Sequence, residues 1–370
     1  MRIGIPKEVK DNESRVALTP AGAHELIAHG HEVLIEEGAG DASSLPDTDY
    51  LRVGARIVKS AAEMWQSAEM ICKVKEPLES EYPLLGRDQI LFTYLHLAAS
   101  RSCTDALLEA GTIAIAYETV QAPDGSLPLL APMSEIAGRM APLAAAEHLQ
   151  RPAGGRGVLM SGVAGVRPAR VVVIGAGVAG ANAAAIAAGM HADVVVLDKD
   201  IAKLRSLDAL YRGQLETLAS SSHTIEEVCL GADVVIGAVL VAGARAPRLV
   251  SDALVAAMRP GSVLIDIAVD QGGCFESTHP TTHTNPTFRV HDSLFYCVAN
   301  MPGAVPHTST HALTNATLSY ILEVANVGWR RAALTDPSLA AGVNAVGGVL
   351  TNASVAEAHG LNAVALEELV

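Results

Sequence analysis

Short apolar runs alternate with amphipathic segments along most of the chain. In the first third, the apolar runs predict strands at 2–5, 32–36, 70–74, 90–94 and 112–117. The segments between them predict helices at 21–29, 60–67 and 101–110. Thr19 and Pro20 mark one helix start, because a hydroxyl caps free N–H groups and proline suits the first turn. This alternation is typical of parallel βαβ units.

A second series of βαβ units follows a long helix. The helix is predicted at 131–150, and a glycine-rich turn follows at 151–157. Almost wholly apolar strands are then predicted at 171–174, 194–197, 234–238, 263–267 and 295–298. Such strands are expected in parallel sheets that are covered on both faces. From about His307 to Val370 the pattern becomes helical again, and its longest helical run is 313–331.

One uncharged stretch, 171–192, is long enough to span a membrane. Its glycines at 175, 177, 180 and 189 make a span improbable, since turn backbone is hard to satisfy in lipid. The stretch therefore predicts a buried strand, a glycine-rich turn and a buried helix.

Length and charge narrow the class of protein. The chain has 370 residues, which suggests two or three domains, and half of its residues are apolar. Lys and Arg number 26 and Asp and Glu number 40, giving a net charge of −14, which argues against nucleic-acid and anionic-membrane partners. Only 18% of residues are charged, so disorder is excluded for most of the chain.

The cysteines and the N-terminus indicate the compartment. Five widely spaced cysteines form no CxxC pair, so they suggest neither a disulfide framework nor a zinc site. Charges at 7, 8, 10 and 11 interrupt any apolar run, so we expect no secretory leader. A reducing cytoplasm is the simplest location.

The strongest local signal is a glycine-rich turn. Gly175, Gly177 and Gly180 follow an apolar strand and open a helix, and Asp198 ends the next strand, 23 residues after the first glycine. This pattern is the dinucleotide-binding fingerprint, in which the helix N-terminus binds phosphates and the acidic residue binds the ribose. An aspartate repels a 2′-phosphate, so NAD is preferred over NADP, although Lys203 lies nearby. The alternative is a buried glycine turn without a ligand.

Four polar residues are candidates for chemistry on a substrate. Lys75 and His96 each follow an apolar strand, where α/β crevices form, and Asp270 precedes a Gly-Gly turn after another strand. Arg15 offers a bidentate fork for a carboxylate. From spacing alone, Lys75 and Arg15 are better explained as solvated residues, His96 is as readily a satisfied core histidine, and Asp270 has ordinary turn chemistry as its alternative.

Two histidine pairs at four-residue spacing, 279/283 and 307/311, are weak metal candidates. The first pair has Pro280 between its members, and neither pair has an acidic third ligand in HExxH form. We therefore predict no metal site.

Several segments together resemble the family of the alanine dehydrogenases and the NAD-binding subunit of transhydrogenase. They are MRIGIPKEVKDNESRVALTP, KVKEP, LHLAASR, APMSEIAGRMA, GGRGVLMSGVAGVRP, VVVIGAGVAG, DIAVDQGGCFE and CVANMPGAVPHTST, and they extend to about residue 330. The resemblance implies an α/β fold with two doubly wound Rossmann-like domains. A discontinuous substrate domain (1–128 plus 307–370) would surround a central NAD-binding domain (129–306). It also implies a homohexamer.

The resemblance implies NAD-dependent, reversible oxidative deamination of L-alanine to pyruvate and ammonium. Arg15 and Lys75 would hold the substrate, His96 would be the acid/base, and Asp270 would assist proton transfer. The two domains would clamp the nicotinamide against the amino acid, which requires that His96 not point into an apolar interior. Alternatives are a transhydrogenase-type nucleotide-binding subunit and a dehydrogenase for another small amino acid.

The resemblance also assigns cofactor contacts besides the three glycines. These are Ser134, Val178, Ala179, Asp198, Lys203, Ser220, Val239, Leu240, Ile267, Ala268, Val269, Asp270, Val298, Ala299, Asn300 and Met301. Two positions depart from relatives. His279 stands where relatives carry an arginine near the nucleotide, and Val327 stands where some relatives carry a histidine usable with Glu118 for a divalent ion.

Overall fold

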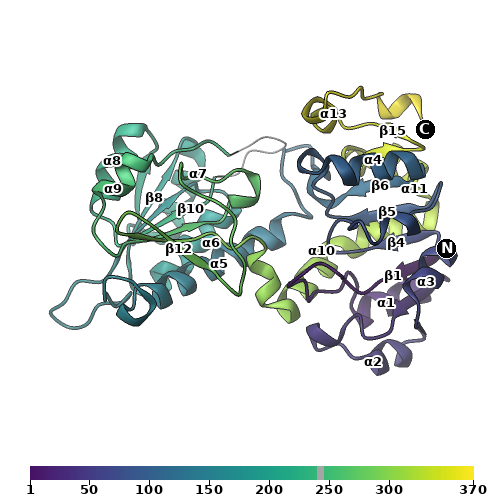
Figure 1. Cartoon of the computed structure of the whole chain (residues 1–370), viewed down its shortest axis with the longest axis horizontal. Coiled ribbons are helices and arrows are strands. Elements are labelled where there is room, and N and C mark those ends of the chain that lie inside the picture. Colours follow the sequence, from purple (N-terminus) through teal and green to yellow (C-terminus); the bar gives the residue numbers. More distant parts are fainter. Residues whose placement is uncertain (240–245) are drawn as a thin grey trace. The chain divides into compact units, whose positions relative to one another are not determined.

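The chain divides into two compact units. The computed structural model describes residues 1–239 and 246–370, so Leu240, an expected cofactor contact, lies outside the described residues. Unit 1 comprises Met1–Met133 and Gly303–Val370, and unit 2 comprises Ser134–Pro302 (Figure 1). The domain boundaries expected from the sequence, 128/129 and 306/307, lie within five residues of these divisions.

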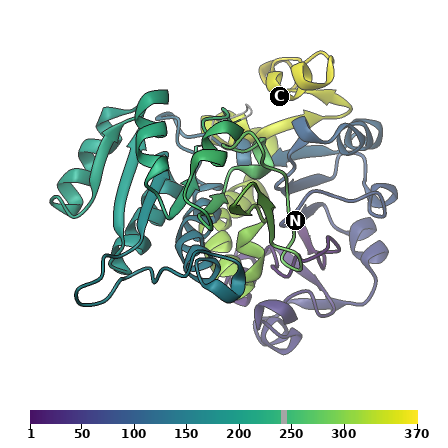
Figure 2. The ribbon, with the colours of Figure 1, turned by 60° about the vertical axis from the view of Figure 1, so that its left-hand side comes forward.

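Unit 1 is built on an eight-stranded sheet in the order β15-β14-β6-β5-β4-β1-β2-β3. Its strands are β1 (Arg2–Ile5), β2 (Glu32–Glu36), β3 (Arg56–Val58), β4 (Met70–Cys72), β5 (Ile90–Thr93), β6 (Ile113–Ala116), β14 (Val343–Val346) and β15 (Val349–Leu350). Strands β1 to β6 are parallel, and β14 is antiparallel to both β6 and β15. Figure 2 shows the same sheet from another side.

Helices cover unit 1 because both faces of its strands are apolar. The helices are α1 (Pro20–Ala28), α2 (Asp47–Arg52), α3 (Ala61–Ser67), α4 (Arg101–Ala110), α10 (Pro306–Val327), α11 (Trp329–Thr335), α12 (Pro337–Gly342) and α13 (Ala353–His359). Helices α3, α4 and α13 contribute to one core cluster with the strand residues Leu34, Ile71 and Leu91. The alternate strand residues Ile35 and Phe92 are also buried, as expected when the second face is covered.

The C-terminal tail corrects the expectation of purely helical character after His307. Residues 343–350 form the β14–β15 hairpin, whose turn uses Gly347 and Gly348, both at positive φ. Short buried strands of four and two residues carry too little periodicity to be told from helix by pattern alone.

Unit 2 contains a seven-stranded sheet in the order β12-β13-β11-β10-β7-β8-β9. Its strands are β7 (Arg170–Ile174), β8 (Asp193–Asp198), β9 (Glu216–Ala219), β10 (Val234–Gly237), β11 (Val263–Asp266), β12 (Thr287–Val290) and β13 (Ser293–Tyr296). Its helices are α5 (Ala131–His148, begun in unit 1), α6 (Val178–Gly189), α7 (Ile201–Tyr211), α8 (Ser222–Leu230) and α9 (Asp252–Ala257). Helices α5, α6 and α7 pack on one face, and α8 and α9 pack on the other.

Both sheets reverse their strand order at one point. In unit 1 the reversal lies between β1 and β4, and in unit 2 it lies between β7 and β10. In doubly wound folds, ligands bind beyond the carboxyl ends of the strands at such a switch point. The α/β class expected from the sequence is confirmed.

The apolar stretch 171–192 forms β7, a glycine turn and α6. Among the described residues, no helix has both the length and the apolar character that crossing a bilayer requires.

Candidate functional site

The glycine turn after β7 is shaped by close backbone contacts. Gly175 has φ +107°, and a Cβ on it would lie 2.7 Å from the carbonyl oxygen of Ala238. A Cβ on Gly180 would lie 1.7 Å from the carbonyl oxygen of Gly175, so only glycine lets α6 pack this closely on the turn. A Cβ on Gly177 would meet nothing within 4 Å. Open space at Gly177 gives a phosphate room to approach the backbone.

The N-terminus of α6 faces this open space without a side-chain cap. Gly177 is the N-cap residue and offers no side chain to accept from the first N–H groups. Uncapped N–H groups and the helix dipole favour an anionic ligand. The turn and α6 therefore fit the pyrophosphate of a dinucleotide.

Asp198 hydrogen-bonds the backbone of this turn. The Oδ2 atom of its carboxylate accepts a hydrogen bond from the N–H of Ala176 at 2.6 Å, and Oδ1 accepts from the N–H of Asp200 at 2.8 Å. The carboxylate is half-buried at the end of β8, beside the glycine turn. Its place fits an acceptor for ribose hydroxyls.

Most of the other expected cofactor contacts lie at the same edge of the sheet. Ser220, Val239, the 267–270 segment and the 298–301 segment follow β9, β10, β11 and β13, respectively. Val178 and Ala179 are in the first turn of α6, and exposed Lys203 is on α7. Ser134 lies on α5, one turn before Gly138. The strands that these segments follow are parallel, so their carboxyl ends share one edge.

Gly138 is a residue that the sequence reasoning missed. A Cβ on Gly138 would lie 2.2 Å from the carbonyl oxygen of Ala179, so α5 touches the start of α6 there. Next to it, Arg139 donates to Asn182 Oδ1 at 2.9 Å. A glycine inside a long predicted helix was the available signal for this close approach.

His279, the position expected to depart from relatives, contacts an aromatic ring. Its exposed ring stacks on Phe288, with ring centroids 3.7 Å apart. Asn300, at φ +66°, accepts through its carbonyl from His283 Nε2 at 3.1 Å.

Asp270 lies in unit 2, and a second aspartate, Asp266, comes shortly before it in the sequence. Asp270 is exposed on a short 3-10 turn, Val269–Gln271, whereas Asp266 is fully buried at the end of β11. Burial raises the pKa of Asp266 to about 6, whereas the nearby Thr278 hydroxyl and hydrogen bonds from the N–H groups of Cys274 and Ala268 lower it. The sequence reasoning passed over Asp266, although an acidic residue inside an apolar strand was a usable signal.

In unit 1, His96 follows β5 and has an unusual backbone conformation. Its φ and ψ are 49° and 38°, and its N–H donates to Glu118 Oε1 at 2.6 Å, which stabilises this left-handed conformation. The half-buried ring stacks on Tyr94 with centroids 6.0 Å apart. Its nitrogens have no hydrogen-bond partner within residues 1–239 and 246–370. The ring therefore does not lie sealed in an apolar interior.

Arg15 is held by a neighbouring carboxylate. The guanidinium is 2% exposed, and its Nε and Nη2 donate to Glu13 Oε1 and Oε2 at 2.7 and 2.5 Å. Burial alone would raise the pKa of Glu13, but the hydrogen bonds and charge of Arg15 outweigh it and lower that pKa. Nη1 points to Met133 Sδ at 2.9 Å, a weak acceptor that a substrate carboxylate can outcompete. The sequence reasoning missed Glu13.

The two lysines of the KVKEP segment have different surroundings. Lys73 is fully buried and pairs with Glu8 at 3.1 Å and Glu81 at 2.8 Å. Glu8 also accepts from the N–H groups of Val74 and Lys75, at 2.6 and 3.3 Å. Lys73 is therefore part of an ionic network that supports the backbone of Lys75.

Lys75, Arg15 and His96 belong to one neighbourhood of unit 1. The Lys75 carbonyl accepts from Thr93 Oγ1 at 2.9 Å, on the strand that leads to His96. The charge of Lys75 also contributes to the low pKa of Glu13, the partner of Arg15. Lys75 and His96 follow β4 and β5, next to the strand reversal. Two cations and an imidazole suit the binding of a carboxylate and the transfer of a proton.

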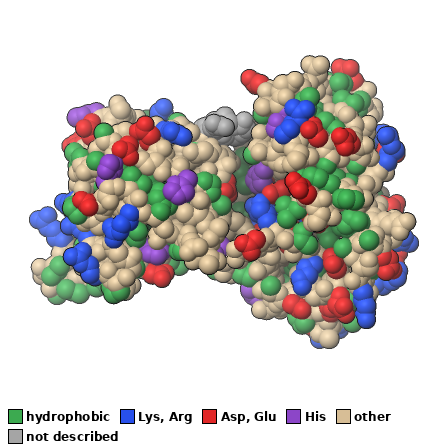
Figure 3. Space-filling view, in the orientation of Figure 1, with side chains coloured by type: hydrophobic (Ala, Val, Ile, Leu, Met, Phe, Trp, Pro, Cys, Tyr) green, Lys and Arg blue, Asp and Glu red, His purple; other side chains and the backbone are tan. Residues whose placement is uncertain are grey.

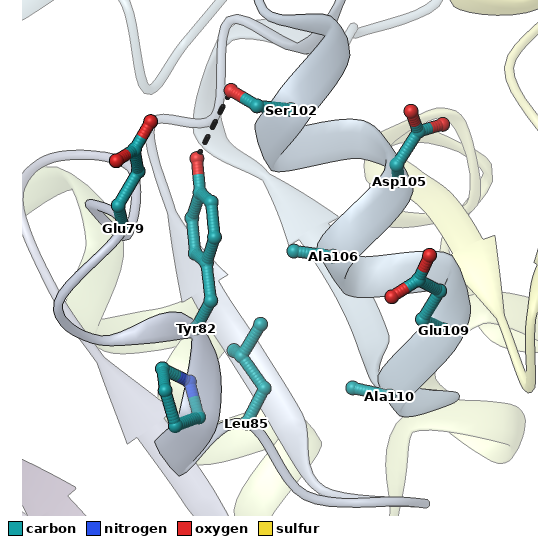
Figure 4. Close-up of a pocket in the computed structure, with 9 residues that line it drawn as sticks. Glu79, Tyr82, Leu85, Ser102, Asp105, Ala106, Glu109 and Ala110 are labelled. Carbon is teal, nitrogen blue, oxygen red and sulfur yellow. Dashed lines mark hydrogen bonds between the residues drawn. The ribbon is translucent and has the colours of Figure 1, made fainter.

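A shallow depression of about 710 Å³ lies elsewhere on unit 1 (Figure 4). It is lined by Glu79, Tyr82, Pro83, Leu85, Ser102, Asp105, Ala106, Glu109 and Ala110. None of the predicted site residues lines it.

Acidic and basic side chains are interspersed over the face of the molecule that Figure 3 shows.

No group of three or more metal-binding side chains gathers in the part of the chain that the structure describes. The rings of His307 and His311 lie 4.9 Å apart between centroids. Glu118 instead accepts from the N–H groups of Leu95 and His96.

Comparisons with known proteins agree with this architecture. Residues 4–137 match the N-terminal domain of the family "Alanine dehydrogenase/PNT", and residues 141–353 match its C-terminal domain. The chain is 61% identical over 356 residues to an alanine dehydrogenase of Mycobacterium tuberculosis, covering 96% of each protein. A solved L-alanine dehydrogenase is 50% identical, with TM-score 0.93, covering 97% of this chain and 99% of its own. A transhydrogenase from Sinorhizobium meliloti is 25% identical, with TM-score 0.80, covering 96% of this chain and all of its own. The chain belongs to the alanine dehydrogenase/PNT family.

Proposed function

We propose that this chain is an NAD-dependent L-alanine dehydrogenase, which converts L-alanine, NAD⁺ and water to pyruvate, ammonium, NADH and a proton, reversibly. The observation that carries the proposal is the grouping of Arg15, Lys75 and His96 beside the strand reversal of unit 1. Full-length similarity to alanine dehydrogenases supports the same activity.

Arg15 and Lys75 bind the substrate carboxylate and carbonyl. Glu13 accepts two hydrogen bonds from one edge of the Arg15 guanidinium, so the group is already oriented before a substrate arrives. Preorganised, desolvated cations bind a carboxylate more strongly than solvated ones. Positioning of the reactants can supply about 7 kcal/mol or more of the barrier reduction.

The cofactor residues are those at the edge of the unit 2 sheet. When bound, NAD⁺ accepts a hydride from the substrate Cα. The uncapped start of α6 binds its pyrophosphate, and Asp198 accepts from the ribose hydroxyls. Because a carboxylate repels a 2′-phosphate, Asp198 favours NAD over NADP.

His96 moves the protons. Loss of one proton from the ammonium group of alanine and of the hydride from its Cα leaves an iminium ion, to which water adds while a ring nitrogen of neutral His96 takes a proton from the water and later returns it to the leaving nitrogen. Collapse of the resulting carbinolamine releases ammonium and pyruvate. Imidazole titrates near neutrality, which suits both directions. We assign the assisting carboxylate to Asp270.

The test is turnover of L-alanine by the purified chain, followed by NADH absorbance with NAD⁺ and, separately, NADP⁺. A His96→Ala variant should lose about 10²- to 10⁴-fold in kcat while it still binds NADH. Near-normal turnover by that variant would remove His96 from the mechanism. NADH binding without turnover of alanine by the wild type would favour the transhydrogenase-type subunit instead.

A survey of initial rates over small amino and 2-oxo acids separates alanine from other substrates. Higher kcat/KM for a different amino acid would replace alanine in the proposal. We further propose a cytoplasmic homohexamer. The five cysteines, all buried and unpaired, support a reducing compartment, and light scattering on the purified chain measures the assembly.

A further inference from the structure

The carboxylate of Asp266 is buried in unit 2, and the mechanism above does not use it. It is the last residue of β11 and has no exposed surface. Within the described residues it forms no ion pair with a lysine or arginine. A buried charge without a counterion is costly, so it persists only where hydrogen bonds compensate.

These hydrogen bonds come from both ends of one loop. Oδ1 accepts from the N–H of Ala268 at 3.1 Å, and Oδ2 accepts from the N–H of Cys274 at 3.0 Å. The hydroxyl of Thr278, which donates to Cys297 Sγ at 3.3 Å, also lies near the carboxylate and lowers its pKa. The 267–274 loop is thus closed around one side chain, with exposed Asp270 between its two tethered ends.

The backbone of the loop is shaped around the same carboxylate. Gly272 and Gly273 have φ values of +99° and +77°, which favour glycine. A Cβ on Gly273 would lie 2.5 Å from Asp266 Oδ2. At its start, the loop is also tied to β10 through the bond from Ile267 N–H to Gly237 oxygen, at 3.0 Å.

We propose that Asp266 is a positioning residue that fixes the 267–274 loop, so that Asp270 and the cofactor contacts at 267–269 are held in place. The inference rests on the proposed function. It adds to that function a residue that touches neither substrate nor cofactor. The ionised carboxylate strengthens both backbone hydrogen bonds, since charge-assisted bonds are about twice as strong as neutral ones.

The test is Asp266→Asn, assayed with alanine and NAD⁺ at about pH 8, where the wild-type carboxylate is ionised. An amide has one acceptor oxygen, so the variant leaves one buried N–H opposite an NH₂ donor. We expect kcat to fall and KM for NAD⁺ to rise, each by about tenfold, with KM for alanine nearly unchanged.

Asp233→Asn is the matched control. Asp233 is also buried in unit 2 and accepts from a backbone N–H, that of Arg170 at 2.8 Å, but it precedes β10 at the opposite end of the strands and, unlike Asp266, pairs with Arg156 at 2.9 Å and Arg259 at 3.6 Å. Its loss tests the general cost of removing a buried carboxylate. We expect its kcat and KM for NAD⁺ to stay within about twofold of the wild type.

A double-mutant cycle with Asp270→Asn separates positioning from general damage. If Asp266 acts through Asp270, adding Asp266→Asn to the Asp270 variant should lower kcat little further. The proposal would be overturned if the losses in kcat of the two single variants multiplied in the double variant. It would also be overturned if either single variant kept wild-type kinetics. Hydrogen exchange should show faster exchange at Ala268 and Cys274 in Asp266→Asn, and unchanged exchange there would also overturn it.

If Asp266→Asn does not fold, Thr278→Val tests the same idea by removing the hydroxyl group that lies near the carboxylate. It should raise KM for NAD⁺ about threefold, and no change would count against the proposal. If the wild type binds NADH but does not oxidise alanine, the proposed function fails. In that case NADH affinity and hydrogen exchange of the variants still test the loop.

Discussion

Two lysines separated by one residue have different surroundings in unit 1. Lys73 is fully buried between Glu8 and Glu81, whereas Lys75 keeps 8% of its surface exposed beside Glu13. The sequence analysis placed Lys75 at a strand end and gave no separate environment to Lys73. Only the folded chain brings Glu8, 65 residues away, to Lys73.

Lys73→Met should therefore lower the stability of the fold, whereas Lys75→Met should weaken substrate binding. Loss of Lys73 leaves two buried carboxylates without their cation and should lower the unfolding free energy by about 3–5 kcal/mol. Loss of Lys75 should leave stability nearly unchanged and raise KM for pyruvate at least tenfold, because substrate binding is lost. Urea unfolding and steady-state kinetics measure the two effects, and the reverse pattern would contradict these roles.

Asp266 also predicts a pH dependence of stability. Its pKa is raised from 3.8 to about 6, so between these values the folded chain keeps a proton that the unfolded chain has released. The folded state then binds more protons, and the unfolding free energy falls as pH rises through this window, by about 3 kcal/mol in total. Below pH 4 and above pH 7 this contribution is constant.

Urea unfolding of the wild type and Asp266→Asn across this window measures the effect. The variant should lack this part of the slope, while Asp233→Asn should keep it. Equal slopes in the wild type and Asp266→Asn would show that the carboxyl titrates normally.

Among the elements, the β7–turn–α6 segment contains one glycine, Gly180, that is needed for packing and another, Gly177, that is needed for cofactor binding. A Cβ at position 180 would collide with the Gly175 carbonyl oxygen, whereas a Cβ at position 177 would enter open space. The fingerprint in the sequence named all three glycines together, and the backbone contacts show which of them the packing requires.

Gly177→Ala should fold with a melting temperature near that of the wild type and bind NADH about tenfold or more weakly, since the methyl group occupies phosphate space. Gly180→Ala should lower the melting temperature strongly, because the turn must shift. Calorimetry and NADH titration measure both variants, and normal NADH binding by Gly177→Ala would remove the turn from the cofactor site.

Elements with local signals were predictable, and elements that depend on pairing were not. The strands at 2–5 and 32–36 and the helix at 101–110 were predicted with the bounds that the structure has. Strands β3, β9 and β12 are short or half-exposed, and they form by pairing with neighbours that the local pattern does not specify. Similarly, the fork of Arg15 was visible in the sequence, but its bidentate partner became clear only from geometry.

At the scale of the whole molecule, each unit has its own sheet and core. We therefore expect NADH to protect unit 2 selectively in hydrogen exchange of the full chain, with the largest change at 175–180 and 267–274. Binding to the folded state alone stabilises it by mass action, which slows exchange through opening of that unit. Pyruvate, in contrast, should protect segments around Arg15, Lys75 and His96. Protection by NADH confined to unit 1 would contradict the assignment of the cofactor residues.

The hairpin of β14 and β15 has a consequence for biosynthesis. β14 completes the sheet of unit 1 by pairing with β6, yet the ribosome makes all of unit 2 between these two strands. During translation, β6 is thus an open edge that can pair with other chains, while unit 2 can already collapse around its own core. Nascent chains stalled before residue 343 should consequently be recognised by chaperones through unit 1 and not through unit 2.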